Sequence, residues 1–234
     1  MLAKLAKRPI FIPILNGRHF VLERHVEFHW HSGFAKSQKQ KSIQALHEMA
    51  LQEYHVKNPL EVSSKSEDSL GVALSSFNLQ FTTQMGRTLT VEAAFQGSKA
   101  FALGGPYTDI FGMLPIDAKR DIRLKESGSL EKFRFFGSEW ELEPKTAFYD
   151  WLYINALLKN PMLAGEITDH DGFTDIEFNP EKSINCQARS VALYCALYHN
   201  DKIDFALESR RNFLSLYAGK VSDPHHPEPV RHLV

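Results

Sequence analysis

The chain has 234 residues, of which 43% are hydrophobic and 24% are charged, and these proportions exclude a mostly disordered, collagen-like or coiled-coil chain. Lysine and arginine number 27, aspartate and glutamate 28, and the resulting net charge of −1 argues against a protein that coats nucleic acid without specificity. No run of about 18 apolar residues predicts a membrane span and no signal peptide is expected, so we predict a cytoplasmic protein.

Alternating apolar residues predict a β-hairpin within residues 9–31, because Asn16-Gly17 between two such runs is typical of a two-residue turn. The polar and basic segment 33–41 is expected to be a loop. A helix is predicted to follow and to end before Pro59. Its apolar stripe would consist of Ile43, Leu46, Met49, Ala50 and Tyr54.

Residues 60–64 and 71–82 look like strands on either side of a polar turn. Thr90 is a favourable N-cap for a helix over 90–101, which Gly104-Gly105-Pro106 would end. Residues 105–139 are predicted to consist mostly of loops.

A strong helix is predicted over residues 144–159, and the acidic segment 163–183 is expected to be irregular. Two helices should follow, at about 184–199 and 202–217, and the proline-containing tail 219–234 is expected to be flexible. Strands and helices are segregated without regular βαβ alternation, which predicts an α+β fold in which helices dominate.

Both cysteines, Cys186 and Cys195, fall within one predicted helix. Nine residues of helix rise about 13.5 Å, which is too far for a disulfide. We therefore expect two reduced thiols.

Glu92, Gln96 and Lys99 are spaced so that all three share one face of the predicted helix. A carboxylate, an amide and an amine in a row suit an acid/base group, a hydrogen-bonding group and a nucleophile. Ala93 and Ala94 are small and would let another element pack closely. The pattern also fits a solvated surface stripe with a Glu–Lys pair, and charged helix faces are usually solvated.

Asp175, Glu177 and Asn179 alternate as they would on one face of a strand. They could form a polar wall that positions a substrate or an ion, or they could belong to a solvated acidic loop. Asn185 and Gln187 begin the next predicted helix, whose free N–H groups could bind a phosphate.

Two basic segments could contact phosphates, although each of them alone could also be an ordinary solvent-exposed surface. Taken together, the two segments are consistent with a surface that binds nucleic acid. They contain Lys36, Lys39 and Lys41, and Lys119, Arg120, Arg123 and Lys125.

His25, His29 and His31 are in phase on the predicted hairpin, but no other Cys or His completes a set of ligands at a known spacing. We expect neither a metal site nor a cofactor, and no P-loop, GxSxG or GxGxxG motif is present.

Two groups of residues resemble motifs of the NADAR superfamily. Leu74-Ser75-Ser76-Phe77 and residues 90–99 (TVEAAFQGSK) are similar to its L-S-N-F and T-x-E-H-x-F-Q-x-x-K motifs. Trp140-Glu141 and Asn160-Pro161 are similar to its W-E and N-P-x-L stretch. Ser76 replaces the motif asparagine, Ala93 replaces the motif histidine, and the usual W-G is absent.

The closer resemblance is to the NADAR antitoxins that are encoded beside DarT toxins. It lies in residues 33–43 (GFAKSQKQKSI), 61–66 (EVSSKS) and 173–188 (FTDIEFNPEKSINCQA). The whole resemblance covers roughly residues 9–215. It implies a mostly helical single domain over 1–218 with a small antiparallel sheet, in which 9–60 form a hairpin-plus-helix extension and 61–218 the core.

The resemblance implies a guanine ADP-ribosyl glycohydrolase that removes ADP-ribose from guanine bases in DNA and thereby reverses a DarT-type toxin. Lys99 would trap the opened ribose as a Schiff base and Glu92 would transfer protons. The expected partners are ADP-ribosylated, single-stranded DNA, the ADP-ribose product and, functionally, the toxin.

The remaining roles are implied by the same resemblance. Substrate binding would fall to Ser76, Phe77, Asn78, Gln96, Trp140, Asp175, Glu177, Asn179 and Asn185. DNA or phosphate binding would fall to Lys36, Lys39, Lys41, Arg120 and Arg123. The alternatives are an N-glycosidase for a small metabolite, such as a riboflavin-pathway intermediate, and a non-catalytic module that binds ADP-ribose or sequesters a toxin. The presence of both Glu92 and Lys99 favours an enzyme.

Overall fold

The chain is described by a computed structural model that places residues 5–16 and 19–217. The predicted tail 219–234 and Gly17 of the predicted turn lie outside these residues. The helices are α1 (Lys36–Tyr54), α2 (Ser69–Ala73), α3 (Val91–Gly97), η1 (Thr108–Gly112), α4 (Pro115–Arg120), α5 (Arg123–Glu126), α6 (Ala147–Leu158), α7 (Pro161–Glu166), η2 (Ile167–Asp169), α8 (Gln187–His199), α9 (Ile203–Glu208) and α10 (Arg210–Ser215). The strands are β1 (Leu5–Pro13), β2 (Val21–His29), β3 (Pro59–Glu61), β4 (Gln80–Thr82), β5 (Thr88–Thr90), β6 (Lys99–Phe101), β7 (Leu130–Phe135), β8 (Ser138–Glu141) and β9 (Gly172–Thr174).

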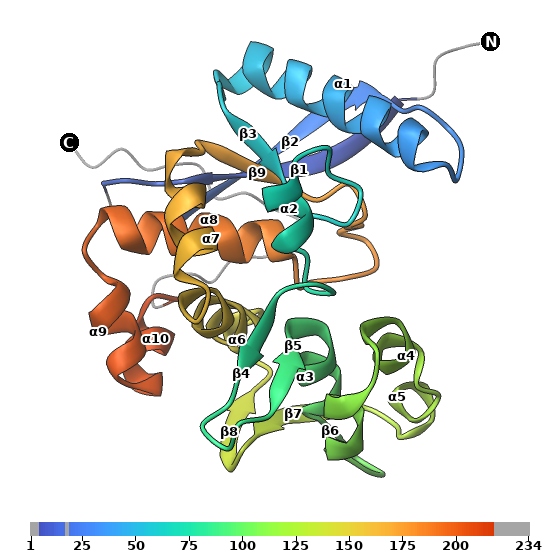
Figure 1. Ribbon diagram of the computed structural model, residues 1–234, viewed down its shortest axis with the longest axis vertical. Helices are drawn as coiled ribbons and strands as arrows, with labels where there is room; N and C mark the ends of the chain where they lie inside the picture. Colours follow the sequence, from blue (N-terminus) through green and yellow to red (C-terminus); the bar gives the residue numbers. More distant parts are fainter. Residues whose placement is uncertain (1–4, 17–18, 218–234) are drawn as a thin grey trace.

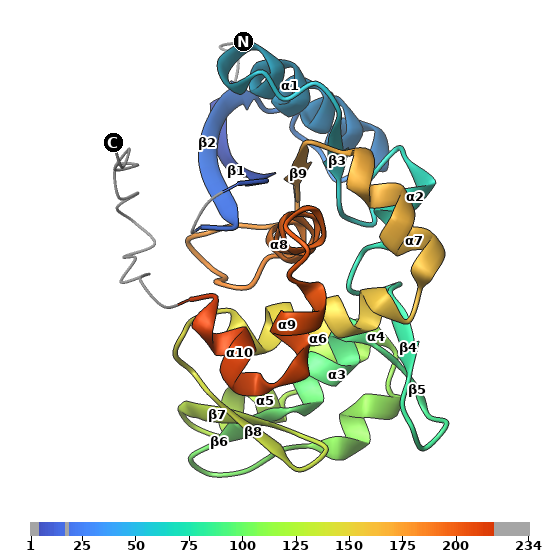
Figure 2. The ribbon, with the colours of Figure 1, turned by 90° about the vertical axis from the view of Figure 1, so that its left-hand side faces the viewer.

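The fold is α+β, as predicted, and within the described residues the strands form three small sheets. The largest has the order β2-β1-β9-β3, in which only the β3–β9 pair is parallel, and the others are β4-β5 and β6-β7-β8. Figures 1 and 2 both place the four-stranded sheet and α1 in one half of the molecule and α3, α5 and the three-stranded sheet in the other. Helices α6 and α8 pack against each other between these halves.

The predicted N-terminal hairpin is confirmed, with β1 and β2 paired from Leu5↔His29 to Pro13↔Val21. Its connection is longer than the two residues Asn16-Gly17, because the pairing stops at Pro13 and Val21. The hairpin shares its sheet with β9 and β3, so the predicted extension is joined to the core by main-chain hydrogen bonds.

The basic segment expected to precede the first helix is part of it. Helix α1 begins at Lys36, so Lys36, Lys39 and Lys41 lie on its first turns and not in a loop. The buried side of α1 contains Ser42, Ile43, Leu46 and Ala50, which includes three of the five predicted stripe residues.

The strand predicted over 71–82 is wrong for most of its length, since 69–73 form α2 and strand geometry begins at Gln80. The side chain of Asp68 accepts a hydrogen bond from the N–H of Leu70 and starts this helix. Gly71 lets α2 approach β3 closely, because a Cβ there would lie 2.0 Å from the carbonyl oxygen of Glu61. The apolar alternation of this segment therefore reflects a short buried helix and turn.

Three other predicted boundaries change. Residues 105–139 contain η1, α4, α5 and β7, and the segment 163–183 contains most of α7 together with η2 and β9. The helix predicted over 144–159 is confirmed as α6. The helix predicted over 202–217 is divided at Ser209, whose extended backbone ends α9 and whose hydroxyl caps α10. Cys186 precedes α8, and both cysteines are free and buried.

Candidate active site

Helix α3 carries the centre of the candidate site. Thr90 caps it as predicted, because its hydroxyl accepts a hydrogen bond from the N–H of Ala93. Glu92 in the first turn is only 5% exposed. Its Oε2 accepts a hydrogen bond from Oγ of Ser76 (3.1 Å) and its Oε1 accepts one from Nε2 of Gln96 (2.9 Å). A buried carboxylate is thus held by two neutral donors.

Lys99 does not lie on α3, although the sequence predicted that it would. The helix ends at Gly97, where a Cβ would lie 2.5 Å from the ring of Phe111, and Lys99 is the first residue of β6. The chain passes from helix to strand at Ser98, so Lys99 stays beside the last helical turn. Its Nζ donates a hydrogen bond to Oε1 of Gln96 (2.7 Å). Glu92, Gln96 and Lys99 are therefore brought together as predicted, but not by helical periodicity alone.

The environment of Lys99 favours its neutral form. The pKa of Lys99 is lowered to about 8, chiefly by burial; the negative charge of Glu92 opposes this shift and the positive charge of Lys119 adds to it. The Nζ atom lies 4.8 Å from the centre of the Phe95 ring. Near neutral pH the amine of Lys99 is unprotonated more often than that of an ordinary lysine, which is what a nucleophilic amine requires.

Two residues that the sequence did not single out for this purpose lie around Ser76, which donates a hydrogen bond to Glu92. Gln187 opens α8, and its Oε1 accepts a hydrogen bond from the N–H of Ser76 (2.7 Å) while its Nε2 donates one to the carbonyl oxygen of Val62 (2.6 Å). Tyr149 on α6 is buried beside Ser76 and Glu92, and burial raises the pKa of this phenol well above its usual value. Gln187 was noted only as a helix-opening residue, and nothing local in the sequence links Tyr149 to Glu92.

The residues that follow Ser76 differ in their surroundings. Phe77 is half-buried, and Nζ of Lys119 lies 5.2 Å from the centre of its ring. Asn78 is exposed, and its Nδ2 donates a hydrogen bond to the carbonyl oxygen of Val72 (2.8 Å), which closes the turn after α2. Phe77 therefore belongs to the surroundings of the site, whereas the contact of Asn78 is structural.

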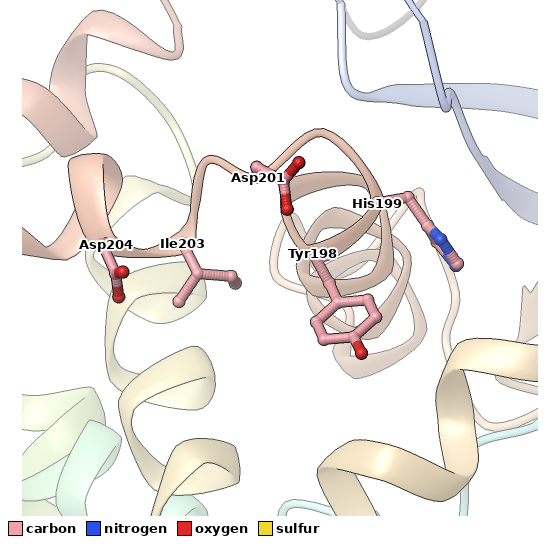
Figure 3. Close-up of a pocket in the computed structure, with 5 residues that line it drawn as sticks. All are labelled: Tyr198, His199, Asp201, Ile203 and Asp204. Carbon is pink, nitrogen blue, oxygen red and sulfur yellow. The ribbon is translucent and has the colours of Figure 1, made fainter.

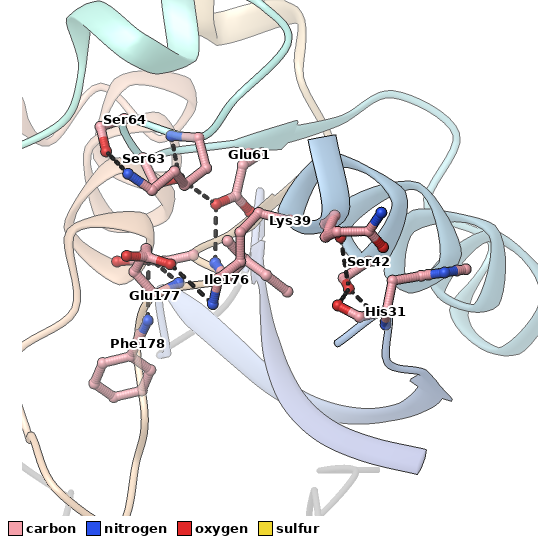
Figure 4. Close-up of polar contacts among 12 residues, drawn as sticks. His31, Lys39, Ser42, Glu61, Ser63, Ser64, Ile176, Glu177 and Phe178 are labelled. Carbon is pink, nitrogen blue, oxygen red and sulfur yellow. Dashed lines mark hydrogen bonds and ion pairs between the residues drawn. The ribbon is translucent and has the colours of Figure 1, made fainter. Parts of the chain in front are cut away.

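Asp175, Glu177 and Asn179 do not form the polar wall that was one of the two interpretations of their pattern. Strand β9 ends at Thr174, and Oδ1 of Asp175 accepts hydrogen bonds from the N–H groups of Glu177 (3.0 Å) and Phe178 (3.2 Å). Figure 4 shows Glu177 beside Lys39, with Oε1 to Nζ at 3.2 Å. Oδ1 of Asn179 accepts the N–H of Glu181. These residues form a turn after β9, in which each of the three side chains has a different partner.

A second buried carboxylate, Glu61, was missed by the sequence analysis. Its Oε1 accepts hydrogen bonds from Ser63 (2.6 Å) and the N–H of Ile176 (2.9 Å), and its Oε2 accepts one from Thr174 (2.7 Å) (Figure 4). Burial raises the pKa of Glu61. Burial raises the pKa of Asp175 to about 8, with the charge of Glu61 as the next cause. Glu61 opens the 61–66 stretch of the family resemblance, but two of its partners, Thr174 and Ile176, lie on β9 and the turn after it, which the sequence does not link to it.

The proposed stacking role of Trp140 does not fit the structure. Its side chain is 3% exposed, and its ring centre lies 5.8 Å from that of Phe148, 5.1 Å from Trp151 and 6.3 Å from Phe213. Among the described residues its Nε1 has no hydrogen-bond partner. Because these aromatic side chains enclose the indole ring of Trp140, a base cannot stack on it. Trp140 is therefore a core residue.

Asn185 lines a cavity of about 230 Å³ next to the three-stranded sheet. Its walls include Phe133, which pairs with Lys99 in the β6–β7 ladder, and Phe148, whose ring packs on Phe95. The cavity therefore lies close to the aromatic wall on which Lys99 rests. A larger cavity, of about 390 Å³, is lined by Tyr198, His199, Asp201, Ile203 and Asp204 and contains none of the predicted site residues (Figure 3).

The predicted phosphate-binding residues are separated in space. Figure 1 shows α1 at one end of the molecule and α4 and α5 in the opposite half. Arg123 donates hydrogen bonds to Asp109 and Asp121, so two carboxylates already neutralise its charge. Lys39 pairs with Glu177, whereas Lys36, Lys41 and Arg120 are exposed. The structure does not bring the two segments into one surface.

Within residues 5–16 and 19–217, no group of three or more His, Cys, Asp or Glu residues could hold a metal ion. In the same part of the chain, no helix is long and apolar enough to cross a membrane.

Comparison with known proteins identifies one family. The sequence matches the family described as DarT1-associated NADAR antitoxin over residues 6–227. The match includes the hairpin, α1 and every residue of the candidate site. The comparison with curated proteins found no match.

Proposed function

This chain belongs to the DarT1-associated NADAR antitoxin family, and from that premise we propose that it is an antitoxin enzyme that removes ADP-ribose from guanine bases in DNA. The observation that supports catalysis is the arrangement of Lys99, Gln96 and Glu92. An amine whose pKa is lowered to about 8 by burial is hydrogen-bonded through one amide to a buried carboxyl group. A module that only binds ADP-ribose or a toxin has no need for such an amine.

The proposed reaction uses Lys99 as the nucleophile. Its neutral amine attacks the anomeric carbon of the ribose, and the bond between that carbon and the guanine nitrogen breaks with its electron pair going to guanine. Glu92, as a carboxylate, takes the proton that the attacking amine loses and passes it to the departing base. The bond between the anomeric carbon and the ring oxygen then breaks, with the nitrogen lone pair forming the C=N bond of a protonated Schiff base and the ring oxygen taking a proton from solvent, which is returned when water adds. Water then adds to its carbon, the amine of Lys99 leaves, and ADP-ribose is released.

Substrate positioning is assigned to the residues around these two groups. Ser76 and Gln96 hold the carboxyl group of Glu92, and Gln96 also holds the amine of Lys99. We assign Asn185 to the base, because its side chain lines the cavity beside Phe133. Asp175, Glu177 and Asn179 receive no substrate-binding role, since their contacts form the turn after β9.

The start of α1 is assigned to the DNA strand. Phe34 is fully exposed and precedes the exposed residues Lys36 and Lys41. An aromatic side chain beside cations suits single-stranded DNA, because bases stack on the ring and phosphates contact the cations. The NADAR core would supply the chemistry and the N-terminal hairpin and helix would supply the strand contact.

The test is product formation from a guanine-ADP-ribosylated oligonucleotide in the presence of EDTA. Release of free ADP-ribose together with the unmodified oligonucleotide is the expected result. Cleavage of a riboflavin-pathway N-glycoside in place of the oligonucleotide would favour the small-metabolite reaction. Binding of ADP-ribose or of a DarT-type toxin without cleavage of either substrate would favour a non-catalytic module.

A further inference from the structure

Helix α4 lies directly against the helix that carries Glu92. Ala118 of α4 is fully buried in a small cluster with Ala93 and Ile110, and α4 packs on α3 through this contact. Because both contacting residues are alanines, α4 can lie close to α3. The small residues Ala93 and Ala94 predicted such a close contact with another element. The next residue of α4, Lys119, is therefore held beside the site.

The ammonium group of Lys119 lies over Phe77. The distance from Nζ to the ring centre is 5.2 Å, and Phe77 directly follows Ser76, whose hydroxyl donates to Glu92. The Lys119 side chain is exposed, and within the described part of the chain it forms no ion pair with a carboxylate. In contrast, Arg123 in the same basic segment is paired with Asp109 and Asp121.

Lys119 supplies a positive charge that reaches the surroundings of Lys99. Glu92 on α3 and Lys119 on α4 are the charged residues that act on Lys99. The strand opposite, β7, presents the uncharged Phe133, and α6 presents Tyr149, whose raised pKa keeps the phenol neutral. One carboxylate therefore faces two amines, and the exposed amine is the one that a ligand can reach.

We propose that Lys119 binds a phosphate group of the substrate, and that the ligand of this site is a ribosyl group that carries a phosphate or pyrophosphate. The contact would hold the ribose against Lys99. This inference rests on the proposed function, because it takes Lys99 as the group that reacts with the ribose. An ammonium held over an aromatic ring and lacking a carboxylate partner is a suitable donor to a phosphate oxygen.

The binding test uses inorganic pyrophosphate and ADP-ribose as probes. Lys119→Met removes the charge but keeps an unbranched side chain over Phe77, and Lys119→Arg keeps the charge. Lys57→Met is the matched control. Lys57 is exposed, and its side chain makes no hydrogen bond or ion pair within residues 5–16 and 19–217. Its replacement changes the net charge of the protein by the same amount as Lys119→Met does. Lys119→Met should weaken ADP-ribose binding about 10- to 150-fold, as for loss of a hydrogen bond to a charged group. Lys119→Arg should retain most of the affinity.

A pH profile tests the position of Lys119 beside Lys99 separately from phosphate binding. The positive charge of Lys119 lowers the pKa of Lys99, so its removal should raise that pKa above about 8. The pH at which kcat/KM reaches half its plateau should therefore move to higher pH in Lys119→Met and stay in place in Lys57→Met. A side chain that only supported the fold would not shift this midpoint.

The outcomes distinguish the inference from the proposed function. If the unmodified protein cleaves the oligonucleotide but Lys119→Met binds both probes as tightly as Lys57→Met does, the phosphate site is wrong and the proposed reaction is unaffected. If Lys119→Met loses probe binding while the unmodified protein cleaves no guanine-ADP-ribose, the phosphate site stands and the reaction is wrong. If Lys119→Met and Lys57→Met lose the same affinity for the probes, the weaker binding is an effect of net charge alone, and the inference is overturned.

Discussion

The amine of Lys99 donates its hydrogen bond to Gln96, at 2.7 Å, and not directly to the carboxylate of Glu92. The same amide donates to Glu92 through its other end, at 2.9 Å. A direct ion pair would hold the proton on Lys99 more firmly, because an adjacent opposite charge stabilises the ammonium form. The intervening amide lets the two groups occupy one site while burial keeps the pKa of Lys99 at about 8.

Replacement of Lys99 by methionine should abolish turnover without unfolding the protein. The Lys99→Met variant keeps an unbranched chain against Phe95 and removes the amine. Borohydride added during turnover should reduce the Schiff base and leave a sugar adduct on the unmodified protein, detected by mass spectrometry, and no adduct on the variant. Turnover at the normal rate by Lys99→Met would show that another group is the nucleophile.

The Glu92→Gln variant should lower the single-turnover rate by about 10²- to 10⁴-fold, as expected for a proton-transfer group, while ADP-ribose still binds. The negative charge of Glu92 raises the pKa of Lys99, so its loss should lower that pKa below about 8. The residual activity should therefore begin at a lower pH than in the unmodified protein. Loss of binding with an unchanged single-turnover rate would instead make Glu92 a ligand of the substrate.

Trp140→Ala should destabilise the protein by about 3–5 kcal/mol, the usual cost of removing a buried aromatic ring. The reason is the contact of its indole with Phe148, Trp151 and Phe213 in the core. Trp140→Phe should destabilise the protein less than Trp140→Ala does. The Trp140→Phe variant should bind ADP-ribosylated DNA with normal affinity. Chemical denaturation and equilibrium binding measure the two effects separately. A normal unfolding midpoint with weakened DNA binding would restore the stacking role.

Asp175 should make the protein less stable as the pH rises. Burial raises the pKa of Asp175 to about 8 in the folded protein, whereas an aspartate in an unfolded chain titrates near about 3.9. The unfolded state releases this proton first, so stability that is fully present below about pH 4 is lost as the pH rises towards about 8. Asp175→Asn can still accept the hydrogen bonds of Glu177 and Phe178, and its unfolding temperature should fall less between pH 5 and pH 9.

The control for this measurement is Asp204→Asn, which removes an exposed carboxylate on α9. It should follow the pH dependence of the unmodified protein. If Asp175→Asn loses as much stability between pH 5 and pH 9 as this control, the carboxyl group of Asp175 is already ionised in the folded state at neutral pH.

Local patterns predicted those parts of the chain whose structure depends on near neighbours. The N-terminal hairpin, the Thr90 cap and the pairing of Glu92 with Gln96 all involve contacts over a few residues or between two adjacent strands. Their geometry follows from backbone periodicity, which a sequence displays directly. The same patterns placed helix ends less well, because Gly97 ends α3 where Phe111 packs against it.

The sequence by itself determined the α+β class, the resemblance to the NADAR antitoxins and the identity of the amine and carboxylate in the candidate site. Only the tertiary structure decided that Gln187 holds Ser76, that Lys119 lies beside that site and that Trp140 is enclosed in the core. These contacts join residues far apart in the chain. They depend on how α4, α6 and α8 pack, and packing is set by the shapes of many side chains together, which no short motif contains.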